Sequence, residues 1–270
     1  MFYAFLAVFL FSWNNVCGAA MNATRAVKEL AGKNGFVEHR IDTPYFTLLS
    51  YARVHEKGAP IVIYIEGDGR AWKNRRTVST DPTPRTPMVF KMMIADGSPN
   101  LAYLARPCQY VGGKNYDSGY WTGKRFSEEV IASMSEAVDE LKSLSGAKEV
   151  KLIGYSGGGA VAVLIAARRE DVIGIVTVAG NLDHVAVNKL HRVGQIGGSL
   201  NPIDVAGKVA DIPQRHFSGD KDNVVPQEVA ETFVIRTGDR QLERLDVVEG
   251  CGHEKGWTGK WKDLVKRTLI

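Results

Sequence analysis

A serine flanked by glycines, between a strand-like run and a helix-like run, is the feature that most constrains this chain. Residues 154–159 read Gly-Tyr-Ser-Gly-Gly-Gly; they follow the run Val150–Ile153 and precede the alanine-rich run Ala160–Ala167. In this context the pattern Gly-x-Ser-x-Gly indicates a nucleophile elbow, a tight turn that presents the serine hydroxyl above a sheet. Glycines are needed because a side chain at either flank would collide with the neighbouring strand or helix. The alternative is a glycine-rich turn without chemistry, because the pattern also occurs by chance.

Strand-like and helix-like segments alternate along the rest of the chain. The run Ile61–Ile65 is apolar throughout, which is typical of a strand buried on both faces. The alternation predicts an α/β fold with a mostly parallel central sheet, right-handed crossovers and helices on both faces. We expect strands at residues 36–41, 46–54, 61–65, 101–105, 149–153, 172–178, 214–217 and 242–248, the first two antiparallel, and helices at 23–33, 88–95, 126–144, 158–169, 227–236 and from about 260.

The length of 270 residues and the hydrophobic content of 44% are sufficient for one large domain, which we place at residues 21–270. Residues 180–208 interrupt the alternation after a predicted strand. Ligands of open α/β sheets bind at the carboxyl ends of the strands. We therefore expect residues 180–208 to form a small cap over the crevice.

The N-terminus has the pattern of a secretory leader. Residues 2–13 are almost wholly apolar, and the small residues Gly18, Ala19 and Ala20 follow. The run is shorter than the roughly 20 residues that span a bilayer, but it suits the core of a signal peptide, which we place at residues 1–20. This predicts export to the periplasm or the medium and a mature chain without a membrane span. A buried N-terminal helix and lipidation of Cys17 are the alternatives.

Loss of Cys17 with the leader would leave two cysteines, Cys108 and Cys251. They could form a disulfide in an oxidising compartment, or remain two free buried thiols. No Cys-x-x-Cys or histidine-rich spacing indicates a metal, so neither a metal nor a cofactor is expected.

Two later loops offer the partners that a serine nucleophile requires. Asp222 follows a predicted strand and precedes a Val-Val-Pro lead into a helix, and His253 lies in the loop Gly-Cys-Gly-His after the last strand. The order Ser156, Asp222, His253 is that of a nucleophile, an orienting acid and a base in α/β-hydrolases. Asp220 is the rival for the acid.

Acyl transfer also requires donors for the developing oxyanion. One is the backbone N–H of Gly157, the residue after the serine. The turn at residues 66–69, Glu-Gly-Asp-Gly, follows the third predicted strand, and the backbone N–H of Asp68 is the candidate for the second donor. The Asp68 carboxylate would then have to point away or pair with Arg70.

Together these motifs resemble the α/β-hydrolase superfamily over roughly residues 36–270. Three further stretches, at residues 64–72, 105–110 and 178–184, resemble uncharacterised exported bacterial members with a Tyr-Ile-Glu-Gly-Asp-Gly turn. The chain departs from the superfamily at Glu66, where many members carry histidine before the glycine. The resemblance implies a fold and a reaction type, but no substrate.

Several side chains near the predicted strand ends are candidates for substrate contact. They are Tyr155, Trp72, Trp121, Asn181 and His184. Aromatic residues of this kind more often serve packing alone.

A net charge of +4 is too small to indicate nucleic-acid binding. Arg70, Lys73, Arg75, Arg76 and Arg85 cluster in sequence, as a solvated loop does; recognition of an anionic substrate is the alternative.

These residues predict a serine hydrolase that acts on a small acyl compound such as a carboxylic ester. An acyltransferase or a peptidase would use the same residues, and a catalytically silent binding protein is a further alternative. A phosphate-binding loop at residues 154–159 is disfavoured, because Ser156 stands where the dinucleotide fingerprint requires glycine.

Overall fold

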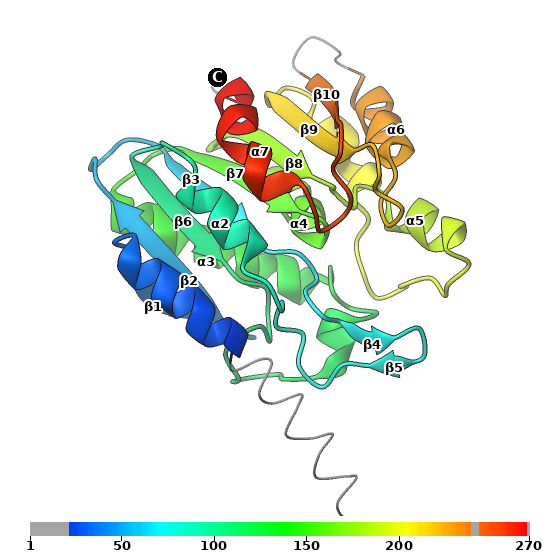
Figure 1. Cartoon of the computed structure of the whole chain (residues 1–270), viewed down its shortest axis with the longest axis horizontal. Helices are drawn as coiled ribbons and strands as arrows, with labels where there is room; N and C mark the ends of the chain where they lie inside the picture. Colours follow the sequence, from blue (N-terminus) through cyan, green and yellow to red (C-terminus); the bar gives the residue numbers. More distant parts are fainter. Residues whose placement is uncertain (1–21, 239–242, 269–270) are drawn as a thin grey trace, which may run out of the picture.

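The centre of the structure is an eight-stranded sheet (Figure 1). The computed structural model describes residues 22–238 and 243–268, so the leader predicted at residues 1–20 lies outside the described residues. The strands lie in the order β1-β2-β6-β3-β7-β8-β9-β10, and neighbours are parallel except β1 with β2 and β2 with β6. Their bounds are β1 Val37–Asp42, β2 Thr47–Val54, β3 Ile61–Ile65, β6 Asn100–Leu104, β7 Val150–Tyr155, β8 Val172–Val178, β9 Gln214–Gly219 and β10 Glu243–Val248. The predicted mostly parallel sheet is confirmed.

Helices cover both faces of this sheet (Figure 1). One face carries α3 (Glu128–Ser145), α4 (Gly157–Ala166), α6 (Gln227–Thr237) and the 3-10 helix η2 (Pro202–Val209). The other carries α2 (Met88–Ile94), α7 (Trp257–Leu264) and the helical residues 22–33. Three short helices complete the described fold: η1 (Ser118–Trp121), α5 (His184–Leu190) and η3 (Val265–Thr268).

Strand β3 shows how the sequence produces two cores. Its side chains alternate across the sheet, so Ile61, Ile63 and Ile65 join the core under α3 and α4. Val62 and Tyr64 join the core under α2 and α7. Because both faces are covered, every residue of β3 is buried, as its uninterrupted apolar run predicts.

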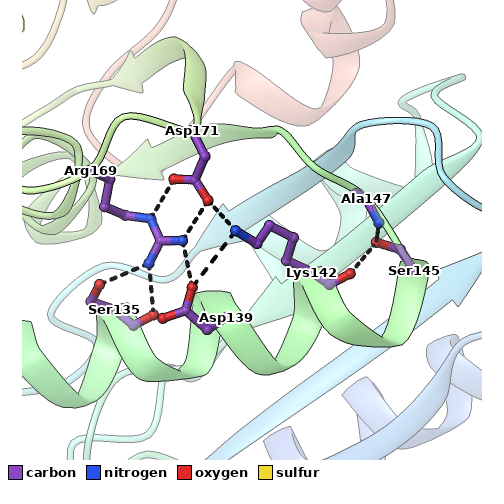
Figure 2. A network of polar contacts seen from close by, with 7 residues as sticks. All are labelled: Ser135, Asp139, Lys142, Ser145, Ala147, Arg169 and Asp171. Carbon is purple, nitrogen blue, oxygen red and sulfur yellow. Dashed lines mark hydrogen bonds and ion pairs between the residues drawn. The ribbon is translucent and has the colours of Figure 1, made fainter.

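An ion-pair network fastens α3 to the turn between α4 and β8 (Figure 2). The guanidinium of Arg169 donates to Asp171, to Asp139 and to Ser135, and Lys142 also donates to Asp171. Burial raises the pKa of Asp171, but the hydrogen bonds from Arg169 and Lys142 outweigh it and lower this pKa to about 2. The network therefore remains ionised through the neutral and mildly acid range.

A small hairpin stands apart from the main sheet (Figure 1). It consists of β4 (Trp72–Asn74) and β5 (Thr77–Val78), and the sequence did not predict it because the strands are short and largely polar. The α7 helix also begins at Trp257, before the expected start near residue 260. None of the described helices has the length and apolar character needed to cross a membrane.

Cys108 and Cys251 are both buried and free. Of the two alternatives, the pair of free buried thiols is therefore confirmed.

Candidate active site

The elbow lies where the connections of the sheet reverse direction. From β3 the chain continues into β6 on one side, then returns to β7 on the other side of β3. The loops after β3 and β7 therefore meet at a topological switch point, where open α/β sheets form their binding crevices. Ser156 lies in this crevice, between β7 and the N-terminus of α4.

The backbone of Ser156 is held in a conformation that side-chain-bearing residues seldom adopt. Its φ is 51° and its ψ is −119°, which is strained for a non-glycine residue. Its N–H donates to the carbonyl of Val178 at 2.9 Å, and its own carbonyl accepts from the N–H of Asn181 at 3.0 Å. Neighbouring β8 thus fixes the turn and with it the direction of the hydroxyl.

Glycines let the elbow pack against its surroundings. A Cβ on Gly154 would lie 2.2 Å from the carbonyl oxygen of Gly158, and one on Gly158 would lie 2.3 Å from that of Ile65. Both obstacles are backbone atoms, which cannot move aside as a flexible side chain can. The glycine requirement expected from the sequence is therefore visible at these two positions.

Ser156, His253 and Asp222 form a continuous hydrogen-bonded chain. Nε2 of His253 lies 3.0 Å from Oγ of Ser156, and Nδ1 lies 2.8 Å from Oδ2 of Asp222. The other carboxylate oxygen of Asp222 accepts from the N–H groups of Val224 at 2.8 Å and Val225 at 2.9 Å. The Asp222 carboxylate is fully buried, and these hydrogen bonds fix its orientation. Asp220, the alternative candidate for the orienting acid, is exposed.

Two aromatic side chains hold the histidine loop. The hydroxyl of Tyr155 donates to the carbonyl of His253 at 3.0 Å, and the indole N–H of Trp257 donates to the same carbonyl at 3.0 Å. The rings of Tyr155 and His253 also lie close, with centroids 5.4 Å apart. The residue before the serine thereby positions the loop that carries the imidazole.

Glu66 is a buried carboxyl group at the edge of the site. It accepts hydrogen bonds from the N–H of Gly67 at 2.9 Å and from the hydroxyl of Tyr103 at 2.8 Å. Burial raises the pKa of Glu66 to about 7, although these hydrogen bonds act to lower it. Glu66 therefore changes charge near neutral pH.

The carboxylate of Asp68 is paired with two arginines that the sequence did not single out. Oδ1 accepts from the buried Arg106 at 3.3 Å, and Oδ2 accepts from Arg125 at 3.0 Å. Pairing with Arg70, one of the two expected arrangements, is therefore wrong. Arg106 and Arg125 follow Asp68 by 38 and 57 residues, so no local pattern connects them.

The two amides expected to bind an oxyanion come from adjacent segments. Among the described residues, no acceptor is bonded to the backbone N–H of Asp68 or of Gly157. Gly157 is the first residue of α4, where backbone N–H groups have no partner within the helix and the helix dipole favours negative charge. The loop after β3 is held by Gln109, which donates to the carbonyl of Gly67 at 2.9 Å.

A cavity of about 500 Å³ opens over Ser156. Its walls come from the loop after β3, the segment before α2, and the loops that carry the aspartate and the histidine. The described lining residues are Glu66, Asp68, Gly69, Arg70, Ala71, Trp72, Pro84, Arg85, Thr86, Met88, Arg125, Tyr155, Ser156, Val224, His253 and Glu254.

Only some of the residues that the sequence offers as candidates for substrate contact line the cavity. Trp72 and Tyr155 line the cavity. Trp121 is buried beneath the hairpin, where its indole N–H donates to the carbonyl of Ser79 at 3.1 Å. Asn181 and His184 are also buried, and His184 stacks on the ring of Phe126. Neither they nor Trp121 are among the described lining residues.

The segment at residues 180–208 does not line this cavity, although His191 contacts the carbonyl of the lining residue Val224 at 2.8 Å. Its η2 helix packs against α4 and α6, and none of its residues is among the described lining residues. The outer wall is instead formed by residues 69–72 and 84–88, which surround the β4–β5 hairpin. In residues 22–238 and 243–268, no cluster of three or more His, Cys, Asp or Glu side chains could hold a metal ion.

No protein-family model and no curated protein matches the sequence. Solved structures do match in three dimensions. The esterase Pf2001 from Pyrococcus furiosus aligns with a TM-score of 0.65 and 15% identity over 88% of this chain and 94% of that chain. Est1E from Butyrivibrio proteoclasticus aligns with a TM-score of 0.62 and 15% identity over 85% and 96%. An acylaminoacyl peptidase from Pyrococcus horikoshii aligns with a TM-score of 0.63 and 12% identity over 86% of this chain and 40% of that chain. The chain has the α/β-hydrolase fold.

Proposed function

We propose that this protein is a serine hydrolase that cleaves carboxylic esters or related acyl compounds through an acyl-enzyme. The observation that carries the proposal is the hydrogen-bonded chain from Ser156 through His253 to Asp222. A serine hydroxyl is a weak nucleophile, and a neighbouring imidazole within hydrogen-bond reach activates it. The strained elbow, the cavity above it and the two unbonded amides supply the other parts that acyl transfer requires.

In the first half of the reaction, Oγ of Ser156 attacks the carbonyl carbon of the substrate, and its proton passes to Nε2 of His253. The carbonyl oxygen becomes an oxyanion, which accepts hydrogen bonds from the N–H groups of Gly157 and Asp68. The tetrahedral intermediate then collapses. His253 gives the proton to the leaving alkoxide, and the alcohol departs from the serine ester.

In the second half, a water molecule takes the place of the alcohol. His253 removes a proton from the water, and the resulting hydroxide attacks the acyl carbonyl. Collapse of the second intermediate returns the proton to Oγ of Ser156 and releases the carboxylic acid. Asp222 keeps the Nδ1 proton of His253 in place and stabilises the imidazolium at each transfer.

Cleavage of an amide is the second candidate, because the same steps apply to a leaving amine. It is favoured by the likeness to a structure described as an acylaminoacyl peptidase. That protein is much longer than this chain, which covers 40% of it, so esters are preferred as the first substrates to test.

The test is labelling with a fluorophosphonate, which reacts with an activated serine without the need for substrate recognition. Wild-type protein is expected to become labelled at Ser156, and the Ser156→Ala variant is expected to lose this label. Equal labelling of the two proteins would overturn the proposal. A panel of 4-nitrophenyl esters of increasing acyl length would then define the acyl preference.

Export remains a prediction from residues 1–20. Fractionation of cells that express the full chain, with N-terminal sequencing of the mature protein, would test it.

A further inference from the structure

Arginine side chains line the cavity over Ser156. Arg70, Arg85 and Arg125 all line it. Arg70 lies in the loop after β3, two residues beyond Asp68, and Arg85 lies in the segment before α2. The two loops are bonded to each other, because the N–H of Arg70 donates to the carbonyl of Pro82 at 2.8 Å. Residues distant from the triad in sequence thus bring positive charge to the same wall.

Asp68, which lines the cavity beside these arginines, is already neutralised. Asp68 is shared between Arg106 and Arg125, so this cluster carries one more positive than negative charge. Nε of Arg125 is buried without a hydrogen-bond partner among the described residues. Only Nη1 of Arg125 bonds to Asp68, and Arg125 is among the described residues that line the cavity.

Arg70 and Arg85 have no carboxylate of their own. Across the described residues, neither guanidinium forms an ion pair or a side-chain hydrogen bond, although Arg70 is half-buried. Two other acids line the cavity. Glu66 is turned inward to Tyr103 and Gly67, and Glu254 is exposed next to His253. Positive charge therefore exceeds negative charge on the wall formed by residues 69–88.

The basic cluster seen in the sequence is divided by the β4–β5 hairpin. Arg75 and Arg76 lie at its turn and are not among the described lining residues. Arg70 and Arg85 do line the cavity, Arg70 half-buried and Arg85 exposed. If this basic cluster were only a solvated loop, there would be no reason for two of its arginines to line the cavity while the other two do not. Guanidinium groups are suited to planar carboxylates, to which they can donate two parallel hydrogen bonds.

We propose that the cavity binds an ester that carries a carboxylate in addition to the scissile bond, and that Arg70 and Arg85 bind this second group. The proposal rests on the proposed ester hydrolysis and names the substrate class for it. The carboxylate can belong to the acyl or to the alcohol part of the ester.

Two matched pairs of substrates test the proposal on the full chain. The acyl side is tested with 4-nitrophenyl hydrogen adipate and its methyl ester, which have the same leaving group. The alcohol side is tested with the butyryl esters of 3-hydroxybenzoate and of methyl 3-hydroxybenzoate. Rates of the Ser156→Ala variant are subtracted, so spontaneous hydrolysis is removed. In at least one pair, kcat/KM is expected to be at least about tenfold higher for the anionic member, since a single charged hydrogen bond already supplies about this factor.

Three variants link the preference to the proposed residues. Arg70→Gln and Arg85→Gln are each expected to lower, about tenfold, the ratio of kcat/KM for the preferred anionic ester to kcat/KM for its neutral partner. Arg76→Gln removes the same charge from the hairpin turn and is the matched control, expected to retain the preference.

The outcomes separate the two proposals. Ser156-dependent turnover of neutral esters with no preference for the anionic member in either pair overturns the carboxylate proposal alone. A preference that Arg76→Gln reduces as much as Arg70→Gln and Arg85→Gln also overturns it, because the general positive field would then be responsible. No Ser156-dependent turnover of any ester, together with no fluorophosphonate label, overturns the proposed function and the carboxylate proposal with it.

Discussion

The carboxylate of Asp68 occupies the space that a side chain on Gly157 would need. A Cβ built on Gly157 would lie 2.0 Å from Oδ1 of Asp68. The loop after β3 therefore packs against the elbow after β7 in the space that is free because Gly157 has no side chain. Asp68 and Gly157 each also carry one of the two candidate oxyanion amides. The contact between these two residues therefore fixes the distance between the two N–H donors.

Substitution Gly157→Ala is predicted to reduce kcat without unfolding the protein. The new methyl group must displace the Asp68 carboxylate, which is held by Arg106 and Arg125, and we expect this displacement to shift the Asp68 amide. Loss of one oxyanion donor costs about 100-fold or more in kcat. Gly207→Ala is the control, since a Cβ there meets no atom within 4 Å. Steady-state kinetics and thermal melts of both variants provide the measurement. Unchanged kcat in a folded Gly157→Ala protein would contradict this coupling between the Asp68 carboxylate and the oxyanion donors.

Substitution Asp222→Asn is predicted to lower kcat by about 10⁴-fold. The amide oxygen can still accept from Val224 and Val225, but the amide NH₂ would face Nδ1 of His253 and favour the wrong tautomer. Asp220→Asn, two residues earlier on the same loop, should change kcat less than about twofold, because the Asp220 side chain is exposed. If the two variants lost activity equally, Asp222 would not be the residue that orients the histidine.

Glu66 predicts a specific pH dependence of stability. Its pKa rises from an ordinary value of 4.5 to about 7 in the folded protein, so folding favours its protonated form. The stability that Glu66 contributes is complete below about pH 4.5 and is lost as the pH rises to about 7. The whole change amounts to about 3 kcal/mol.

A Glu66→Gln variant isolates this effect, because glutamine does not titrate. Denaturant unfolding of both proteins across this pH range should show wild type losing stability relative to Glu66→Gln as the pH rises. Contributions from the other carboxyl groups are common to both proteins and cancel in the difference. Parallel stability curves would contradict the assignment.

Adjacent arginines are predicted to contribute unequally to stability. Arg169 is 9% exposed and bonds to three side chains, whereas Arg168 is 35% exposed and pairs with the exposed Glu128. Arg169→Ala should lower the free energy of unfolding by about 2 kcal/mol, because Asp171 loses its charged hydrogen bonds to Arg169 and keeps, among the described residues, only Lys142 as a counterion. Arg168→Ala should cost less than about 1 kcal/mol. Equal losses in urea unfolding would show that the network in Figure 2 does not act as described.

The sequence predicted those parts of the fold that depend on local patterns. Runs such as Ile61–Ile65 identify buried strands because both faces of the sheet are covered, and helix α3 follows from its own amphipathic repeat. The geometry around Ser156, Asp222 and His253 was also foreseen, since each follows a strand end in a recognisable turn.

The remaining parts depend on contacts between distant segments. Nothing near Asp68 in the sequence indicates Arg106 or Arg125, which reach it from other loops. Trp121 was one of the candidates for substrate contact, with packing as the more frequent role. An aromatic residue in a loop has the same sequence pattern whether it faces a cavity or a packed interior. Only the folded hairpin decides between the two.

The outer wall of the cavity is formed by one continuous stretch of the chain. Residues 69–88 contain the β4–β5 hairpin, and backbone hydrogen bonds from Arg70 to Pro82 and from Ser79 to Ala71 close this segment on itself. The serine, the aspartate and the histidine all come from other segments. An engineer could therefore exchange this excursion for one of different length or charge and select for new substrates while the reacting groups keep their supports. Natural divergence of substrate range could follow the same route, because changes in this segment need not alter the sheet or the elbow.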